Sequence, residues 1–86
     1  MPIISRFYGI SIMMFFKDHN PPHFHAKYQG RIAVFQIKSG RIMGGDLPPL
    51  AKRLIRDWAR KHQKELLDNW DRAQKDGKLK TIKPLE

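Results

Sequence analysis

The chain has 86 residues, carries 17 Lys and Arg against 8 Asp and Glu for a formal charge of +9, and contains no cysteine. A chain of this length builds one hydrophobic core, and the lack of cysteine excludes disulfides and thiolate zinc sites. No apolar run approaches the roughly 18 residues that span a membrane, and residues 1–6 lack the features of a signal peptide. We therefore expect one cytoplasmic domain over residues 1–86, with no membrane contact.

Residues 1–45 are predicted to form a β-sheet. Gly9, Gln29-Gly30 and Ser39-Gly40 mark turns between β-prone segments. The predicted strands cover residues 3–8, 10–16, 24–28, 32–37 and 41–43. The simplest arrangement is an antiparallel meander of three to five strands. The segment 10–16 is apolar on both sides, which indicates a sheet covered on both faces or curled on itself.

Residues 46–77 are predicted to form one long amphipathic helix, with a kink possible at residues 61–63, which makes the fold class α+β. Pro48-Pro49 suits its start and Gly77 suits its stop. Its apolar stripe contains Leu50, Leu54, Ile55, Trp58, His62, Leu66, Trp70 and Ala73. Trp58 and Trp70 are expected in the core, with His62 as a hydrogen-bonded core histidine. Residues 78–86 form a basic tail, which Leu79, Ile82 and Leu85 could tether to the domain.

Basic residues line the opposite side of this helix. They are Lys52, Arg53, Arg56, Arg60 and Lys64. One interpretation is a solvated helix face, and the other is a ridge that contacts the phosphates of a nucleic acid. A charge of +9 favours an anionic partner such as RNA or an acidic protein.

Three of the four histidines fall within seven residues of one another. Strand alternation places His23, His25 and Lys27 on one face. His19 lies in the preceding loop, which Pro21-Pro22 stiffens. This is the segment of the chain in which a preorganised site is expected.

Three interpretations of this segment are open. His19, His23 and His25 could bind Zn²⁺ or another divalent metal, with Asp18 as a fourth ligand or as a partner of the ligands. The same histidines with Lys27 could instead perform acid–base catalysis on a phosphodiester, as in a small ribonuclease. In the third interpretation the histidines are only structural. Whether the protein is an enzyme is therefore left open.

The chain resembles a family of short bacterial proteins known as domain of unknown function 4160. The resemblance rests on residues 2–10 (PIISRFYGI), 18–26 (DHNPPHFHA) and 45–48 (GDLP), and on Trp58, Ala59, His62, Glu65, Leu66, Asn69 and Trp70. Asn20 stands where relatives often carry another proline. The resemblance implies no agreed activity, but it implies a gene context similar to toxin–antitoxin pairs.

From these observations we expect a toxin-like or partner-binding component of a two-gene module, acting on RNA or on a small protein encoded by the neighbouring gene. The sheet face that the helix leaves open predicts a homodimer or a heteromer. The alternative function is a small metalloprotein or metal-dependent enzyme that uses His19, His23 and His25.

Overall fold

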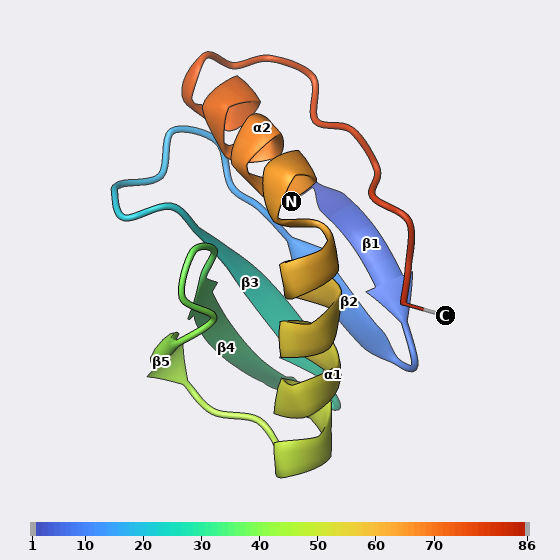
Figure 1. Cartoon of the computed structure of the whole chain (residues 1–86). Helices are drawn as coiled ribbons and strands as arrows, with labels where there is room; N and C mark the ends of the chain where they lie inside the picture. Colours follow the sequence, from blue (N-terminus) through green and yellow to red (C-terminus); the bar gives the residue numbers. More distant parts are fainter. Residues whose placement is uncertain (1, 86) are drawn as a thin grey trace.

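The computed structural model describes residues 2–85 as a five-stranded antiparallel sheet followed by two helices (Figure 1). The strands are β1 (Ile3–Phe7), β2 (Ile10–Met13), β3 (His23–Tyr28), β4 (Arg31–Gln36) and β5 (Ile42–Gly45), and the helices are α1 (Pro49–Lys61) and α2 (Gln63–Gln74). The strands lie in the order β1-β2-β3-β4-β5, so the predicted α+β meander is confirmed. Residues 1 and 86, the two ends of the predicted domain, lie outside the described part.

Two of the strand connections are two-residue turns. Tyr8 and Gly9 link β1 to β2, and Gln29 and Gly30 link β3 to β4; all four residues have positive φ. Positive φ at both central residues gives a turn whose twist matches that of the flanking strands. The hairpin predicted at Gln29-Gly30 is therefore confirmed, and Gly9 forms a tight turn.

Gly45, the last residue of β5, occupies a position that accepts only glycine. Its φ is +69°, and a Cβ there would lie 2.1 Å from the carbonyl oxygen of Ile32 on the neighbouring strand. The glycine therefore allows the close pairing of Gly45 with Ala33 at the edge of the sheet.

Both helices cover the same face of the sheet, and the core lies between the two layers (Figure 1). Phe24 stacks on Phe35 with ring centroids 5.5 Å apart, and its edge meets Trp58 at 5.9 Å. Trp58 and Trp70 are buried, as predicted. Leu50, which belongs to the predicted apolar stripe, is 66% exposed.

The predicted single helix is two helices. α1 ends at Lys61 and α2 begins at Gln63, with His62 between them at φ −116° and ψ 25°. The apolar stripe keeps its spacing through this point, so the break arises from contacts with other parts of the fold. The Gln63 side chain donates hydrogen bonds to the carbonyls of Ile37 and Lys38, at 3.2 and 3.1 Å, which holds the start of α2 against the turn after β4.

α2 ends through a residue other than the predicted glycine. Asp76 takes the left-handed conformation, with φ 55°, and the Gly77 N–H donates to the Arg72 carbonyl at 2.7 Å. The stop therefore lies one residue earlier than Gly77, since the side chain of Asp can tolerate this conformation.

The C-terminal segment runs back along β1, as its apolar residues predicted (Figure 1). The Ile82 N–H donates to the Ile4 carbonyl at 2.7 Å, and Ile82 is buried. Asn69 of α2, fully buried, donates to the Lys80 carbonyl at 2.8 Å and accepts from the Lys80 N–H at 2.9 Å. This segment is thus attached to both layers of the fold.

The sheet face away from the helices carries one row of paired residues that crosses four strands. The row runs Met13, His25, Val34 and Gly44. Ile32 and Met43 are exposed, so this face is only partly apolar and is open. Neither α1 nor α2 is long and apolar enough to cross a membrane, and no other helix occurs in residues 2–85.

Candidate functional site

Asp18, His23 and His25 converge where the loop after β2 meets the start of β3. Each contributes one potential ligand atom, and these atoms lie within 4.8 Å of one another. Asp18 comes from the loop, while both histidines come from the first three residues of β3. The structure therefore confirms that the histidines of β3 lie close together, and it adds Asp18 as the third member of the cluster.

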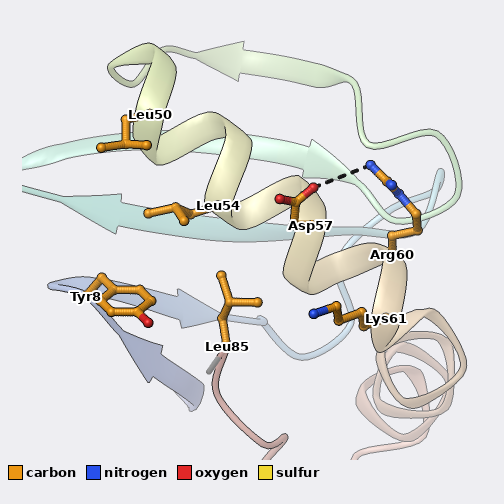
Figure 2. Close-up of a pocket in the computed structure, with 7 residues that line it drawn as sticks. All are labelled: Tyr8, Leu50, Leu54, Asp57, Arg60, Lys61 and Leu85. Carbon is orange, nitrogen blue, oxygen red and sulfur yellow. Dashed lines mark ion pairs between the residues drawn. The ribbon is translucent and has the colours of Figure 1, made fainter.

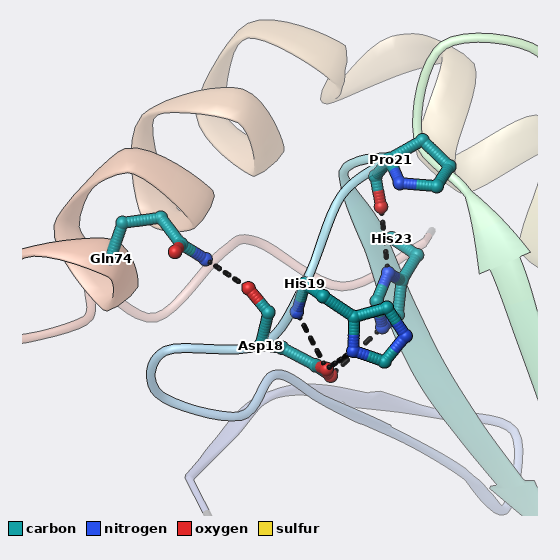
Figure 3. Close-up of polar contacts among 5 residues, drawn as sticks. All are labelled: Asp18, His19, Pro21, His23 and Gln74. Carbon is teal, nitrogen blue, oxygen red and sulfur yellow. Dashed lines mark hydrogen bonds and ion pairs between the residues drawn. The ribbon is translucent and has the colours of Figure 1, made fainter.

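His23 is the central residue of this cluster. Its ring Nδ1 lies 2.8 Å from the Pro21 carbonyl oxygen and its Nε2 lies 2.8 Å from Asp18 Oδ2 (Figure 3). A carbonyl oxygen only accepts, so Nδ1 carries a proton and donates it. His23 Nε2 and the Asp18 carboxylate therefore share a hydrogen bond on the other side of the ring. The His23 side chain is only 6% exposed, so its ring is fixed in place.

Asp18 is held from several sides. Its Oδ1 accepts from the His19 backbone N–H at 2.9 Å, and its backbone carbonyl accepts from Gln74 Nε2 at 2.9 Å (Figure 3). The neighbouring Lys17 N–H donates to the Ala73 carbonyl at 3.0 Å, so the end of α2 secures this loop. Partial burial raises the pKa of the Asp18 carboxyl, but the hydrogen bonds from His19 and His23 and the charges of both rings lower it below its ordinary value.

His25 has a different environment. Its ring meets the Phe15 ring edge to face with centroids 4.5 Å apart, and the His23 ring at 5.5 Å. Burial lowers the pKa of His25 and the charge of His23 lowers it further, while Asp18 acts in the opposite direction. Its Nδ1 is buried and has no hydrogen-bond partner within residues 2–85. His25 is thus a neutral imidazole beside the hydrogen-bonded pair of His23 and Asp18.

The two other residues predicted for this site lie at its margin. His19 is 92% exposed, and its Nδ1 lies 3.2 Å from Asp18 Oδ1 (Figure 3). Lys27 is exposed on the same sheet face as His25, but it pairs with Ser11 and Ile32 and not with the cluster. The structure therefore brings His19 close to Asp18 and leaves Lys27 apart.

These contacts limit the chemistry of the cluster. A general acid or base must reach the reacting group directly or through one water. His23 is buried and both its nitrogens are engaged, so the accessible imidazoles are His19 and His25. The arrangement of two imidazoles and a carboxylate around one point is also a typical donor set for a divalent transition metal.

The predicted basic ridge lies on the outer side of α1 and at the start of α2. Carboxylates neutralise two of its members: Lys52 lies 3.2 Å from Asp46 Oδ1, and Arg60 lies 3.5 Å from Asp57 Oδ1. Arg53 and Lys64 are exposed and form no ion pair with any residue between 2 and 85.

The fifth member of the ridge, Arg56, reaches the turn after β4. Its Nε donates to the Gly40 carbonyl at 3.0 Å. A groove of about 150 Å³ lies between this turn and α1, and Lys38, Arg56 and Arg60 line it together with Ser39 and Gly40. The helix and the turn thus present three cationic side chains around a hollow of phosphate size.

A second groove lies on the far side of α1, against the β1–β2 turn. Tyr8, Leu50, Leu54 and Leu85 form its apolar walls, with Asp57, Arg60 and Lys61 at one end (Figure 2). Its volume is about 490 Å³. Leu50 and Tyr8 are the most exposed apolar residues described, so this hollow is an open apolar surface.

His62 is hydrogen-bonded, as predicted. Its Nδ1 lies 2.7 Å from Glu65 Oε1, and its ring meets Trp58 at 5.6 Å. This histidine lies at the helix break, away from Asp18, His23 and His25.

Several residues of the site were not found by sequence reasoning. Trp70 packs against the His23 ring at 5.1 Å, although only its burial was predicted. Gln74 and Lys38 carried no signal, since polar residues at a helix end or in a turn are common. Lys38 lies two residues before Gly40, and only the fold shows that it lines a groove beside α1 together with Arg56 and Arg60.

Comparison with known protein families matches residues 9–71 to the family described as Domain of unknown function (DUF4160). The matched segment contains the Asp18–His23–His25 cluster and all of α1. No curated protein and no solved structure matches the chain.

Proposed function

The chain belongs to this family of unknown function, DUF4160, and within that frame we propose that it binds the phosphate backbone of RNA through the basic ridge of α1. The observation that carries the proposal is the groove between α1 and the turn after β4. There Lys38, Arg56 and Arg60 surround a space of about 150 Å³.

The groove suits a phosphate because one of its three cations, Arg56, is held in place. Arg56 is fixed by its hydrogen bond to Gly40, and Gln63 ties the same turn to α2 through the Ile37 and Lys38 carbonyls. Arginine side chains present planar donors that match phosphate oxygens. One phosphate would bind against Lys38 and the fixed Arg56, and Arg60 would turn to it from Asp57, its partner at 3.5 Å.

The rest of the ridge extends the surface in both directions. Arg53 lies nearer the start of α1 and Lys64 lies at the start of α2. Both are exposed and without an ion pair among the described residues. Successive phosphates of one strand would follow this line, and the net charge of +9 would attract the strand at low salt.

The test is RNA binding measured by fluorescence anisotropy with a labelled single-stranded oligonucleotide. We count three phosphate contacts: one in the groove, one at Arg53 and one at Lys64. The logarithm of the affinity falls by about 0.7 per contact for each tenfold rise in salt, so the affinity should fall about 20-fold between roughly 50 and 200 mM salt. The double variant Lys38→Gln, Arg60→Gln should bind more weakly. Its matched control is Arg6→Gln, Lys78→Gln, which removes the same charge away from the ridge.

The outcomes separate the possibilities. Loss in the ridge variant with retention in the control supports the proposal. Equal losses in both would show that net charge alone drives binding and would contradict it. Salt-independent binding, or none at low salt, would contradict binding through phosphate contacts.

A role as the toxin-like component of a two-gene module would use the same surface. Expression of the protein alone should then slow growth, and the ridge variant should relieve that effect while the control variant should not. Unchanged growth on expression of the intact protein would argue against a toxin-like role and would leave the RNA measurement to decide binding.

A further inference from the structure

We propose that Asp18, His23 and His25 bind one divalent transition-metal ion, with Zn²⁺ as the expected occupant, and that the metal replaces the proton between His23 Nε2 and Asp18. This site is separate from the basic ridge, and it does not depend on RNA binding.

The spacing of the donor atoms supports the site. Ligands about 2.0–2.1 Å from a tetrahedral zinc ion lie about 3.3 Å from one another. His23 Nε2 and Asp18 Oδ2 are already 2.8 Å apart, and the remaining separations in the cluster are at most 4.8 Å. Binding of one ion would require the donor atom of His25, a half-buried residue, to move closer to the other two.

The groups around the cluster orient its ligands as in known metal sites. A metal-binding histidine usually donates its other ring N–H to a carbonyl or carboxylate, which fixes the ligand nitrogen. His23 Nδ1 donates to the Pro21 carbonyl at 2.8 Å and so turns Nε2 towards Asp18. The Asp18 carboxylate is oriented by the His19 backbone N–H.

Hydrogen-bond accounting leads to the same conclusion. Within residues 2–85, His25 Nδ1 is buried without a hydrogen-bond partner. A buried polar atom without a partner destabilises the folded state. A metal ion bound to both rings and to the carboxylate would bring His25 into an interaction with its neighbours that the hydrogen bonds of the fold do not provide.

The donor set indicates which ion binds. Mg²⁺ and Ca²⁺ prefer oxygen ligands, whereas imidazole favours zinc and its neighbours in the first transition series. Three protein ligands leave a coordination position for water or substrate, which is typical of catalytic zinc sites and not of structural ones. His19 is 92% exposed, and we place it outside the ligand set.

The experiment is zinc binding to the untagged, chelator-treated full chain, measured by isothermal titration calorimetry and by metal analysis after dialysis. We expect one zinc per chain. His25→Ala should lower the affinity by about 100-fold or more, because loss of a mere supporting group already costs about 10–100-fold. Co²⁺ as a probe should give the absorption bands of a low-symmetry site in the intact protein.

His62→Ala is the matched control, since His62 lies at the helix break away from the cluster and pairs with Glu65. It should bind zinc as the intact chain does. His19→Ala should change the affinity less than about tenfold, and a loss equal to that of His25→Ala would overturn the three-ligand assignment. No stoichiometric zinc, or equal loss in the His62→Ala control, would overturn the site itself, with circular dichroism confirming that each variant is folded.

Discussion

Removal of the Asp18 carboxylate tests the geometry of the candidate site directly. In Asp18→Ala, His23 Nε2 loses its partner at 2.8 Å in a ring that is only 6% exposed, and the His19 N–H loses its acceptor. A hydrogen bond to a charged group contributes about 1.5–3 kcal/mol and an ordinary one about 0.5–1.5 kcal/mol. The free energy of unfolding should therefore fall by about 2–4 kcal/mol.

The assay is urea unfolding at neutral pH with a chelator present, so that metal binding does not contribute. Tryptophan fluorescence is a suitable signal because Trp70 packs against the His23 ring at 5.1 Å. Asp18→Asn keeps an acceptor oxygen and should lose less stability than Asp18→Ala.

Asp71→Ala is the control for this measurement. It removes an exposed carboxylate of α2 that pairs with Lys75 at 3.1 Å, and surface pairs of this kind contribute about 0.3–0.5 kcal/mol. If Asp18→Ala were no more destabilising than Asp71→Ala, the described hydrogen bond between Asp18 and His23 would be refuted.

Three further measurements test other parts of the structure. The folded state lowers the pKa of His25, so below about pH 6.5 the unfolded chain binds a proton that the folded chain does not. The free energy of unfolding should therefore be highest above about pH 6.5 and fall as the pH drops through that value. His25→Gln should weaken this pH dependence when unfolding is measured at a series of pH values, and an identical slope would contradict the expectation. Gly45→Ala should lower the thermal midpoint sharply because its Cβ meets a backbone oxygen at 2.1 Å, whereas Gly44→Ala, which meets nothing within 4 Å, should not. Asn69→Ala should cost about 2–4 kcal/mol in urea unfolding, because it leaves the N–H and carbonyl of Lys80 without their partner; a change below about 0.5 kcal/mol would show that the C-terminal segment is not held there.

Local patterns predicted most of the sheet. Glycine turns and β-prone runs act through neighbouring residues, so Gln29-Gly30 and the strands around it were identified from the sequence. The sequence predicted at most a kink near His62, because the full break depends on Gln63 reaching the carbonyls of Ile37 and Lys38, about 25 residues away in the chain. No periodicity within the helix carries that information.

The candidate site was predicted only in part, because local patterns find the residues of one strand but not the contacts between distant segments. Alternation along a strand correctly grouped His23 with His25, but it also included Lys27, which the twist and pairing of the sheet keep apart from the cluster. Asp18 was predicted as a fourth ligand or as a partner of the ligands, and its position beside His23 and His25 depends on how the loop folds back. The His19 side chain is 92% exposed, although its Nδ1 lies 3.2 Å from Asp18 Oδ1.

The attachment of the Asp18 loop to the end of α2 has a consequence for how the protein is made. Gln74 and Asp18 are separated by 56 positions, and the Lys17 N–H pairs with the Ala73 carbonyl. A ribosome therefore releases the three cluster residues long before the helix that fixes them. The cluster can reach its final geometry only when almost the entire chain has emerged, so a truncated product that ends before α2 would contain every cluster residue and still lack the site.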